Sequence, residues 1–179
     1  MFFIIFSFYT KNKFLCHFLY IYIFIYAKIY KISKEIVYIM IRKMKQEELN
    51  EVMNIWLETN IKAHNFIPQK YWEDNFELVK KLISQAEIYI YEKNKNILGF
   101  IGMSSNYIAG IFVKEEEQSK GIGKELLNFI KDIKKELNLN VYEKNIKAVN
   151  FYKRENFYII NEGIDEATGE KEFFMEWKK

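Results

Sequence analysis

Two glycines set one residue apart stand where an apolar run gives way to an amphipathic segment. The run Tyr107–Val113 has the composition of a buried strand, and Gly121 and Gly123 follow it after an acidic turn. They are two of only 7 glycines in the chain. The apolar residues that come next recur at helical spacing, namely Leu126, Leu127, Ile130, Ile133 and Leu137. This succession of strand, glycine turn and helix favours a fold that combines both kinds of element.

The main chain at such a turn predicts a binding site for an anion. The first N–H groups of a helix lack partners within the helix, and the peptide dipoles place positive charge there. Glycines also let a bound group approach the backbone closely. A Walker A loop would need glycine at Gln118 and Ser or Thr at Glu125, and a dinucleotide fingerprint would need glycine at Leu126. The stretch is therefore either a pyrophosphate site of another kind or a tight turn without a ligand.

The periodicity of apolar residues around this unit predicts a single domain. It favours strands at 36–43, 86–93, 96–105, 107–113, 139–144, 156–164 and 166–177, and helices at 47–64, 68–82, 122–137 and 145–155. The order β-α-α-β-β-β-α-β-α-β-β predicts an α/β (α+β) fold. Its sheet is mixed, mostly antiparallel and twisted, with six to seven strands and about four helices on both faces. Gly110, inside one strand, predicts either a bulge or a close packing contact.

Two motifs resemble the GNAT superfamily of acetyl-CoA-dependent N-acetyltransferases. The pyrophosphate loop of that family reads Gln/Arg-x-x-Gly-x-Gly/Ala, and its second signature reads Asn-x-x-Ala-x-x-Phe-Tyr-x-x-x-Gly-Phe. The matching residues are Gln118, Gly121 and Gly123 in the first motif and Asn145, Ala148, Phe151, Tyr152 and Phe157 in the second. Asn156 replaces the usual glycine, and asparagine also tolerates a left-handed conformation. The stretch Ala63–Ile67 is similar to the small YjaB-like bacterial branch, and the resemblance runs from Met40 to the C-terminus.

The resemblance implies the GNAT fold with acetyl-CoA as cosubstrate, and we expect no metal. In this family the strand before the loop and the strand after the helix splay apart, and the first strand binds the pantetheine arm through its backbone. The residues that would bind acetyl-CoA are Ile111, Phe112 and Val113 on the strand, Gln118, Ser119, Lys120, Gly121, Ile122, Gly123 and Lys124 in the loop, and Asn145 and Tyr152 downstream.

The resemblance also implies attack of a neutral amine on the thioester in a ternary complex. Tyr152 would protonate the departing thiolate as general acid; otherwise it is a core aromatic whose hydroxyl reaches the surface. His64 follows the first helix and would be the base, part of the acceptor site, or a packing residue. Tyr107 and Glu92 are weaker candidates for the base.

The identity of the amine acceptor stays open, from small amines to protein lysines. Its pocket would come from the first two helices and the closing hairpin near residues 165–168. The alternative function is a catalytically silent acetyl-CoA-binding domain that regulates a protein partner.

Residues 1–39 differ from the rest of the chain in composition. Of these residues 28 are Phe, Ile, Tyr, Lys or Asn, and five Lys against one Glu give them a charge of +4 where the whole chain has +3. The remainder is near neutral and lacks a basic stripe, so we expect no nucleic-acid partner. The only cysteine, Cys16, also lies in this segment, which suits a reducing cytoplasm.

We expect residues 40–179 to form the GNAT domain, and three interpretations of residues 1–39 stay open. The segment is an extension upstream of a start at Met40, a membrane-associated helix, or structure packed on the domain. Its apolar runs are shorter than the roughly 20 residues of a membrane span and are interrupted by residues 10–13 and by His17. We expect a cytoplasmic monomer or homodimer, with membrane association only if this segment is translated.

Overall fold

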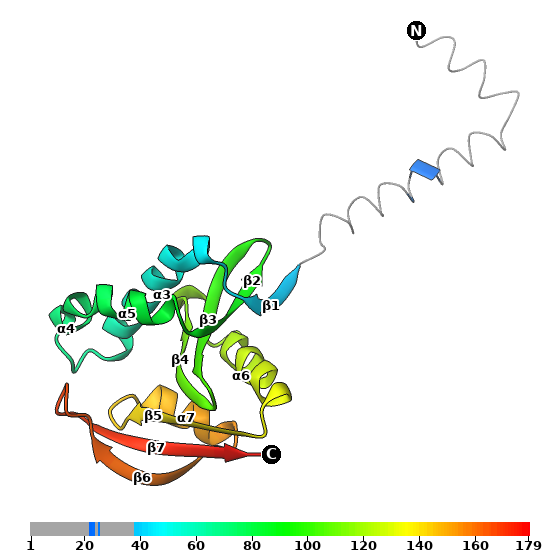
Figure 1. The fold of residues 1–179 in the computed structure, drawn as a ribbon. Helices are drawn as coiled ribbons and strands as arrows, with labels where there is room; N and C mark the ends of the chain where they lie inside the picture. The colour runs from blue at the N-terminus through cyan, green and yellow to red at the C-terminus, as the bar shows by residue number, and fades with distance from the viewer. Residues whose placement is uncertain (1–21, 24, 26–37) are drawn as a thin grey trace, which may run out of the picture. The chain divides into compact units, whose positions relative to one another are not determined.

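The computed structural model describes residues 22–23, 25 and 38–179 (Figure 1). The chain divides into two units, Met1–Val37 and Tyr38–Lys179. In the first unit Tyr22, Ile23 and Ile25 are helical, and the predictions for the other residues up to 37 lie outside the described part. No helix in the part of the chain that the structure describes combines the length and apolar character of a membrane span.

The unit Tyr38–Lys179 is organised around one seven-stranded sheet with the strand order β1-β2-β3-β4-β5-β7-β6. The strands are β1 (Ile39–Lys43), β2 (Glu87–Lys93), β3 (Asn96–Ser104), β4 (Tyr107–Val113), β5 (Glu136–Tyr142), β6 (Tyr158–Ile164) and β7 (Lys171–Lys178). All neighbouring strands are antiparallel except β4 and β5, which are parallel. The predicted mixed, mostly antiparallel sheet is thereby confirmed.

Helices cover both faces of the sheet, as Figure 1 shows. The helical elements are η1 (Gln46–Glu48), α3 (Leu49–Ala63), α4 (Gln69–Asp74), α5 (Phe76–Ile83), η2 (Glu115–Glu117), α6 (Ile122–Ile133) and α7 (Ile146–Arg154). Residues of β2 alternate between the two cores. Ile88 and Ile90 pack with α3, α4 and α5, whereas Tyr89 and Tyr91 belong to the core that contains α6 and α7.

The helix predicted over residues 68–82 is divided in two at Asn75. The side-chain nitrogen of Asn75 donates to the carbonyl of Tyr71 at 2.8 Å, and its backbone N–H reaches the same oxygen at 3.2 Å. A side chain that bonds its own preceding turn competes with the helical ladder. Pro68, expected in the first turn, is the N-cap of α4.

Backbone turns agree with the residues that form them. Asn94 and Lys95 join β2 to β3 with φ of 52° and 67°, the conformation of a type I′ hairpin turn. The register of β3 and β4 shifts so that Ala109, next to Gly110, has no partner. A Cβ on Gly110 would lie 2.5 Å from the ring of Phe112. Both alternatives considered for Gly110 therefore apply, because it adjoins a bulge and admits a ring.

Candidate active site

β4 and β5 are neighbours in the sheet but pair at a single position. The parallel register joins Tyr107 to Asn138, and the N–H of Asn138 donates to the carbonyl of Asn106 at 3.0 Å. The side chain of Asn106 adds a bond to Glu136 at 3.2 Å at the same end. Beyond this point β4 pairs with β3 only. The two strands therefore splay apart.

The splay leaves backbone groups of β4 without a sheet partner on the side toward β5. In antiparallel pairing, alternate residues turn both their N–H and their C=O toward the partner strand. The N–H of Lys114 donates to the carbonyl of Leu98 on β3 at 2.9 Å, which sets the phase of this alternation. Phe112 therefore bonds β3, whereas Ile111 and Val113 direct their backbone groups away from it.

The loop after β4 leaves the N-terminus of α6 open. Ser119 and Gly121 have φ of 60° and 93°, and Gly121 is the N-cap of α6. No side chain of the described residues caps this end, so its first N–H groups stay available for an anion. The amide nitrogen of Gln118 donates to the carbonyl of Val113 at 3.0 Å and ties the loop to β4. The N–H of Val113 and the N–H and C=O of Ile111 would remain available to a pantetheine arm.

The two loop glycines have different roles. Gly121 adopts a positive φ that disfavours any side chain. A Cβ on Gly123 would lie 3.7 Å from Phe151 and 3.8 Å from Ile111, which is ordinary van der Waals contact. Only Gly121 is required by its own backbone conformation.

The lysines of the loop are exposed and already paired with carboxylates. Lys120 lies 3.2 Å from Glu117, and Lys124 lies 3.6 Å from Glu155. Exposed ion pairs contribute little free energy. An anion at this loop would therefore depend mainly on main-chain N–H groups, and the two lysines would add screened charge.

Tyr152 is buried on α7 close to Tyr107, the residue of β4 that pairs with β5. Its ring contacts Phe151 and Phe157 at centroid distances of 5.2 and 5.4 Å. Burial, and then the neighbouring Tyr107, raise the pKa of Tyr152, so the hydroxyl is protonated at neutral pH. It makes no hydrogen bond to the residues of 38–179, so its proton is available. Asn156, after the helix, has the left-handed φ of 66° that the usual glycine would adopt.

His64 and Asn145 lie in contact although they are 81 positions apart. The amide nitrogen of Asn145 is 3.1 Å from Nε2 of His64, and its Oδ1 accepts from the N–H of Ala148 at 3.2 Å as the N-cap of α7. Burial lowers the pKa of His64 to about 4, and the Asn60 carbonyl opposes this effect. The imidazole is therefore neutral near pH 7 and weakly basic.

Aromatic side chains surround His64, and of these the sequence singled out only Phe66, within the stretch Ala63–Ile67. Its ring stacks on Trp72 at 5.3 Å and meets Phe66 and Tyr142 edge-on at 5.7 and 5.3 Å. Tyr142 stands at the end of β5, where its position before the Asn145 motif is the one available sequence signal. Trp72 carried no signal beyond the apolar period of its helix.

Asp165 lies in the turn between β6 and β7. The sequence indicated it only approximately, as part of a hairpin near residues 165–168 that would line the acceptor pocket. Its carboxylate accepts from the hydroxyls of Tyr142 at 2.5 Å and Thr168 at 2.8 Å. Burial raises its pKa, but these bonds and the N–H of Ala167 outweigh that effect, so the pKa of Asp165 is lowered. Burial raises the pKa of Tyr71 on α4, and the charge of Asp165 raises it further. A charged carboxylate thus lies beside the aromatic side chains around His64.

The two weaker candidates for the base are placed differently. Glu92 lies on β2 and accepts from Nε of Arg42 at 2.9 Å, so a structural ion pair holds it. Tyr107 lies at the β4–β5 pair, but burial raises its pKa and keeps it protonated. Tyr107 is therefore not suited to take up a proton at neutral pH, and Glu92 is engaged by Arg42.

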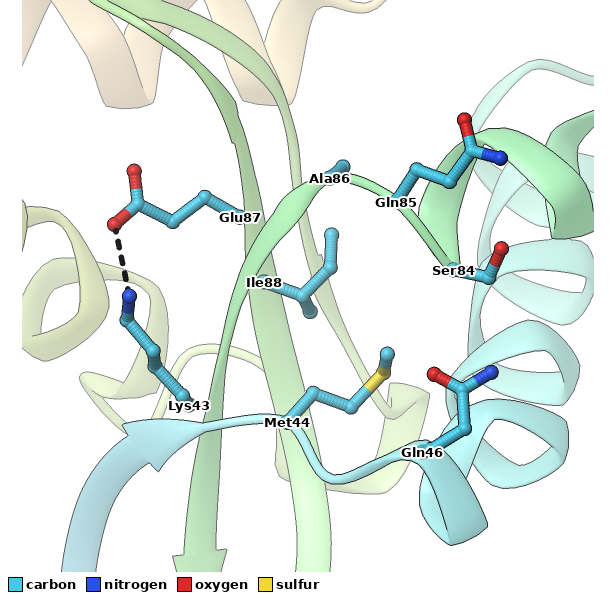
Figure 2. A pocket seen from close by; sticks show the side chains of 8 residues that line it. All are labelled: Lys43, Met44, Gln46, Ser84, Gln85, Ala86, Glu87 and Ile88. Atoms are coloured by element: carbon cyan, nitrogen blue, oxygen red, sulfur yellow. Dashed lines mark ion pairs between the residues drawn. The ribbon is translucent and has the colours of Figure 1, made fainter.

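A shallow pocket of about 290 Å³ lies on another part of the domain, around the end of β1 and the connection from α5 to β2 (Figure 2). In Figure 2 the side chains of Lys43 and Glu87 point toward each other at one side of it, and they form an ion pair at 3.6 Å. Its charged groups are therefore engaged, and β3 separates β2 from β4 in the sheet. This pocket is not part of the candidate active site.

Residues 49–157 match the model of the Acetyltransferase (GNAT) family. The chain belongs to this family. The match spans the splayed strands, the loop at Gly121 and the segment from Asn145 to Phe157, and it confirms the resemblance read from the two motifs.

Known GNAT proteins resemble this chain along most of their length. The peptidyl-lysine N-acetyltransferase YiaC of Escherichia coli is 32% identical over 140 residues, which cover 77% of this chain and 96% of YiaC. The solution structure of apo YjaB from Escherichia coli has a TM-score of 0.70 at 24% identity and covers 78% of this chain and 97% of YjaB. PaiA N-acetyltransferase of Thermoplasma acidophilum, solved with coenzyme A, has a TM-score of 0.68 at 22% identity, with 79% and 99% covered. YiaC is named as an enzyme, which favours catalysis over a silent binding domain.

Proposed function

We propose that this GNAT protein transfers the acetyl group of acetyl-CoA to the ε-amine of lysine in a peptide or protein. The single β4–β5 pair carries the proposal, because the splayed part of β4 leads directly into the open N-terminus of α6. The pantetheine arm would bond the backbone of Ile111 and Val113. The pyrophosphate would bind the main-chain N–H groups from Ser119 to Lys124.

The acceptor class is supported by the relatives and by the charge of the site. YiaC and YjaB are named peptidyl-lysine N-acetyltransferases. The carboxylate of Asp165, beside Tyr71 and Tyr142, would attract a cationic side chain toward the aromatic residues around His64.

The transfer would proceed by direct attack in a ternary complex. The neutral lysine nitrogen attacks the thioester carbonyl, the new N–C bond forms, and the C–S bond breaks. Tyr152 would give its proton to the departing thiolate, and the amine proton would return to Tyr152 through solvent. An ammonium acceptor therefore releases one proton to the solvent per turnover.

The test measures thiol release by the full-length protein with acetyl-CoA and lysine-containing peptides. The matched control peptides carry Nε-acetyl-lysine at the same positions. Acetylation of the lysine, located by mass spectrometry, supports the proposal. Thiol release only with free polyamines would contradict the acceptor class, and coenzyme A binding without release from any amine would favour the silent alternative.

A further inference from the structure

The hydrogen bond between His64 and Asn145 joins the ends of two helices that lie on opposite faces of the sheet. His64 is the C-cap of α3, whose residues pack on one face of the sheet. Asn145 is the N-cap of α7, whose residues belong to the core on the other face. β4 and β5 pair only at Tyr107 and Asn138, near the start of β5. The His64–Asn145 bond lies just beyond the other end of β5 and connects the helices of the two faces there.

The cap of α7 determines which atoms meet in this bond. Oδ1 of Asn145 accepts from the N–H of Ala148, so the amide nitrogen is the atom that faces His64. An amide nitrogen can only donate, and Nε2 of His64 must accept. The ring proton then resides on Nδ1, which is buried; the Asn60 carbonyl acts on the ring, but Nδ1 makes no well-formed hydrogen bond to the described residues. The lone pair of His64 is engaged, and the ring is held between aromatic neighbours.

We propose that His64 is a positioning residue, whose Nε2 holds the Asn145 amide and thereby fixes the start of α7 and the place of Tyr152. The inference rests on the proposed function, since Tyr152 is the proton donor of that reaction. Tyr152 lies seven residues after Asn145, about 10 Å along a rigid helix. A displacement of about 1 Å at a reacting group can cost roughly 10²-fold in rate.

Histidine NMR tests the bond itself without any assay of activity. The chain has 2 histidines, His17 and His64, so ¹⁵N-histidine labelling of the full-length protein and of a His64→Phe variant assigns both. We expect His64 to be the neutral Nδ1–H tautomer at pH 7. An Nε2–H tautomer or an imidazolium would overturn the proposal.

Kinetics separate positioning from proton transfer. Asn145→Ser retains a good N-cap but is too short to reach His64. We expect His64→Phe and Asn145→Ser each to lower kcat about 10-fold, and the double variant to lose no more than the worse single variant. The loss should be the same between pH 6.5 and 9, and His64→Gln, whose Oε1 can accept from Asn145, should recover part of kcat.

Three results would contradict the positioning role. They are additive losses in the double variant, a loss that depends on pH with one inflection removed, and no recovery in His64→Gln while a folded protein still binds acetyl-CoA. If the wild-type protein acetylates no amine, the proposed function fails instead, and the tautomer still reports whether the His64–Asn145 bond exists.

Discussion

The proposed acetyl-CoA side and the proposed acceptor side of the candidate active site are built from different parts of the chain. The proposed acetyl-CoA side consists of main-chain groups of β4 and α6 within one continuous stretch, arranged by Gly121 and a splayed strand. The proposed acceptor side consists of side chains from α3, α4, β5 and the β6–β7 turn, including His64, Trp72, Tyr142 and Asp165. Main-chain groups can bind a common cosubstrate whatever the side chains are, because every residue has a backbone. Binding of an acceptor depends on particular side chains.

Tyr152→Phe tests whether Tyr152 on α7 is the proton donor, and it is expected to have the largest effect. Without the hydroxyl proton the thiolate leaves poorly, so kcat should fall about 10²-fold or more while the Kd for acetyl-CoA is unchanged. Thiol release and calorimetry measure the two quantities. Tyr158→Phe is the matched control, because it removes a hydroxyl on the edge strand β6 that donates to Glu176. An unchanged kcat would remove Tyr152 from the mechanism.

The pH dependence of stability tests the acceptor side alone. Folded His64 has a pKa near 4, below the ordinary value of 6.5, so the unfolded chain binds its proton first as pH falls. The free energy of unfolding should therefore decrease between about pH 6.5 and pH 4, by about 3 kcal/mol. Urea titration of the full-length protein and of His64→Phe measures this difference. An identical pH dependence in both proteins would show that His64 is not buried as a neutral group.

Substitution of the two loop glycines tests the acetyl-CoA side. Gly121→Ala places a side chain at φ 93°, which costs about 1–2 kcal/mol, and should weaken acetyl-CoA binding roughly 5- to 30-fold. Gly123→Ala meets only ordinary contacts and should change the Kd less than about threefold. Calorimetry with acetyl-CoA compares the two variants. Equal losses would mean that the left-handed turn at Gly121 is not what organises the loop.

Asp165→Asn is expected to have the smallest effect, confined to the acceptor. Loss of one partly exposed charge should raise the KM for a lysine peptide about three- to tenfold and leave the Kd for acetyl-CoA unchanged. Glu166→Gln removes the adjacent, exposed charge and is the control. Equal changes in both variants would indicate a general electrostatic effect rather than a contact at Asp165.

Most of the fold could be predicted because local residue patterns report local structure. The turn at Asn94 and Lys95, the start of α6 and the left-handed Asn156 each depend on residues a few positions away. The division of α4 from α5 was missed because an apolar period does not reveal that Asn75 bonds the Tyr71 carbonyl.

The sequence by itself determined the strand, the glycine turn and the helix that follows it, because backbone conformation and the open N–H groups of a helix depend on neighbouring residues. Only the tertiary structure decided that Asn145 meets His64 and that Tyr142 meets Asp165. These contacts join segments that meet only when both cores have packed, and no local pattern encodes a meeting between distant side chains.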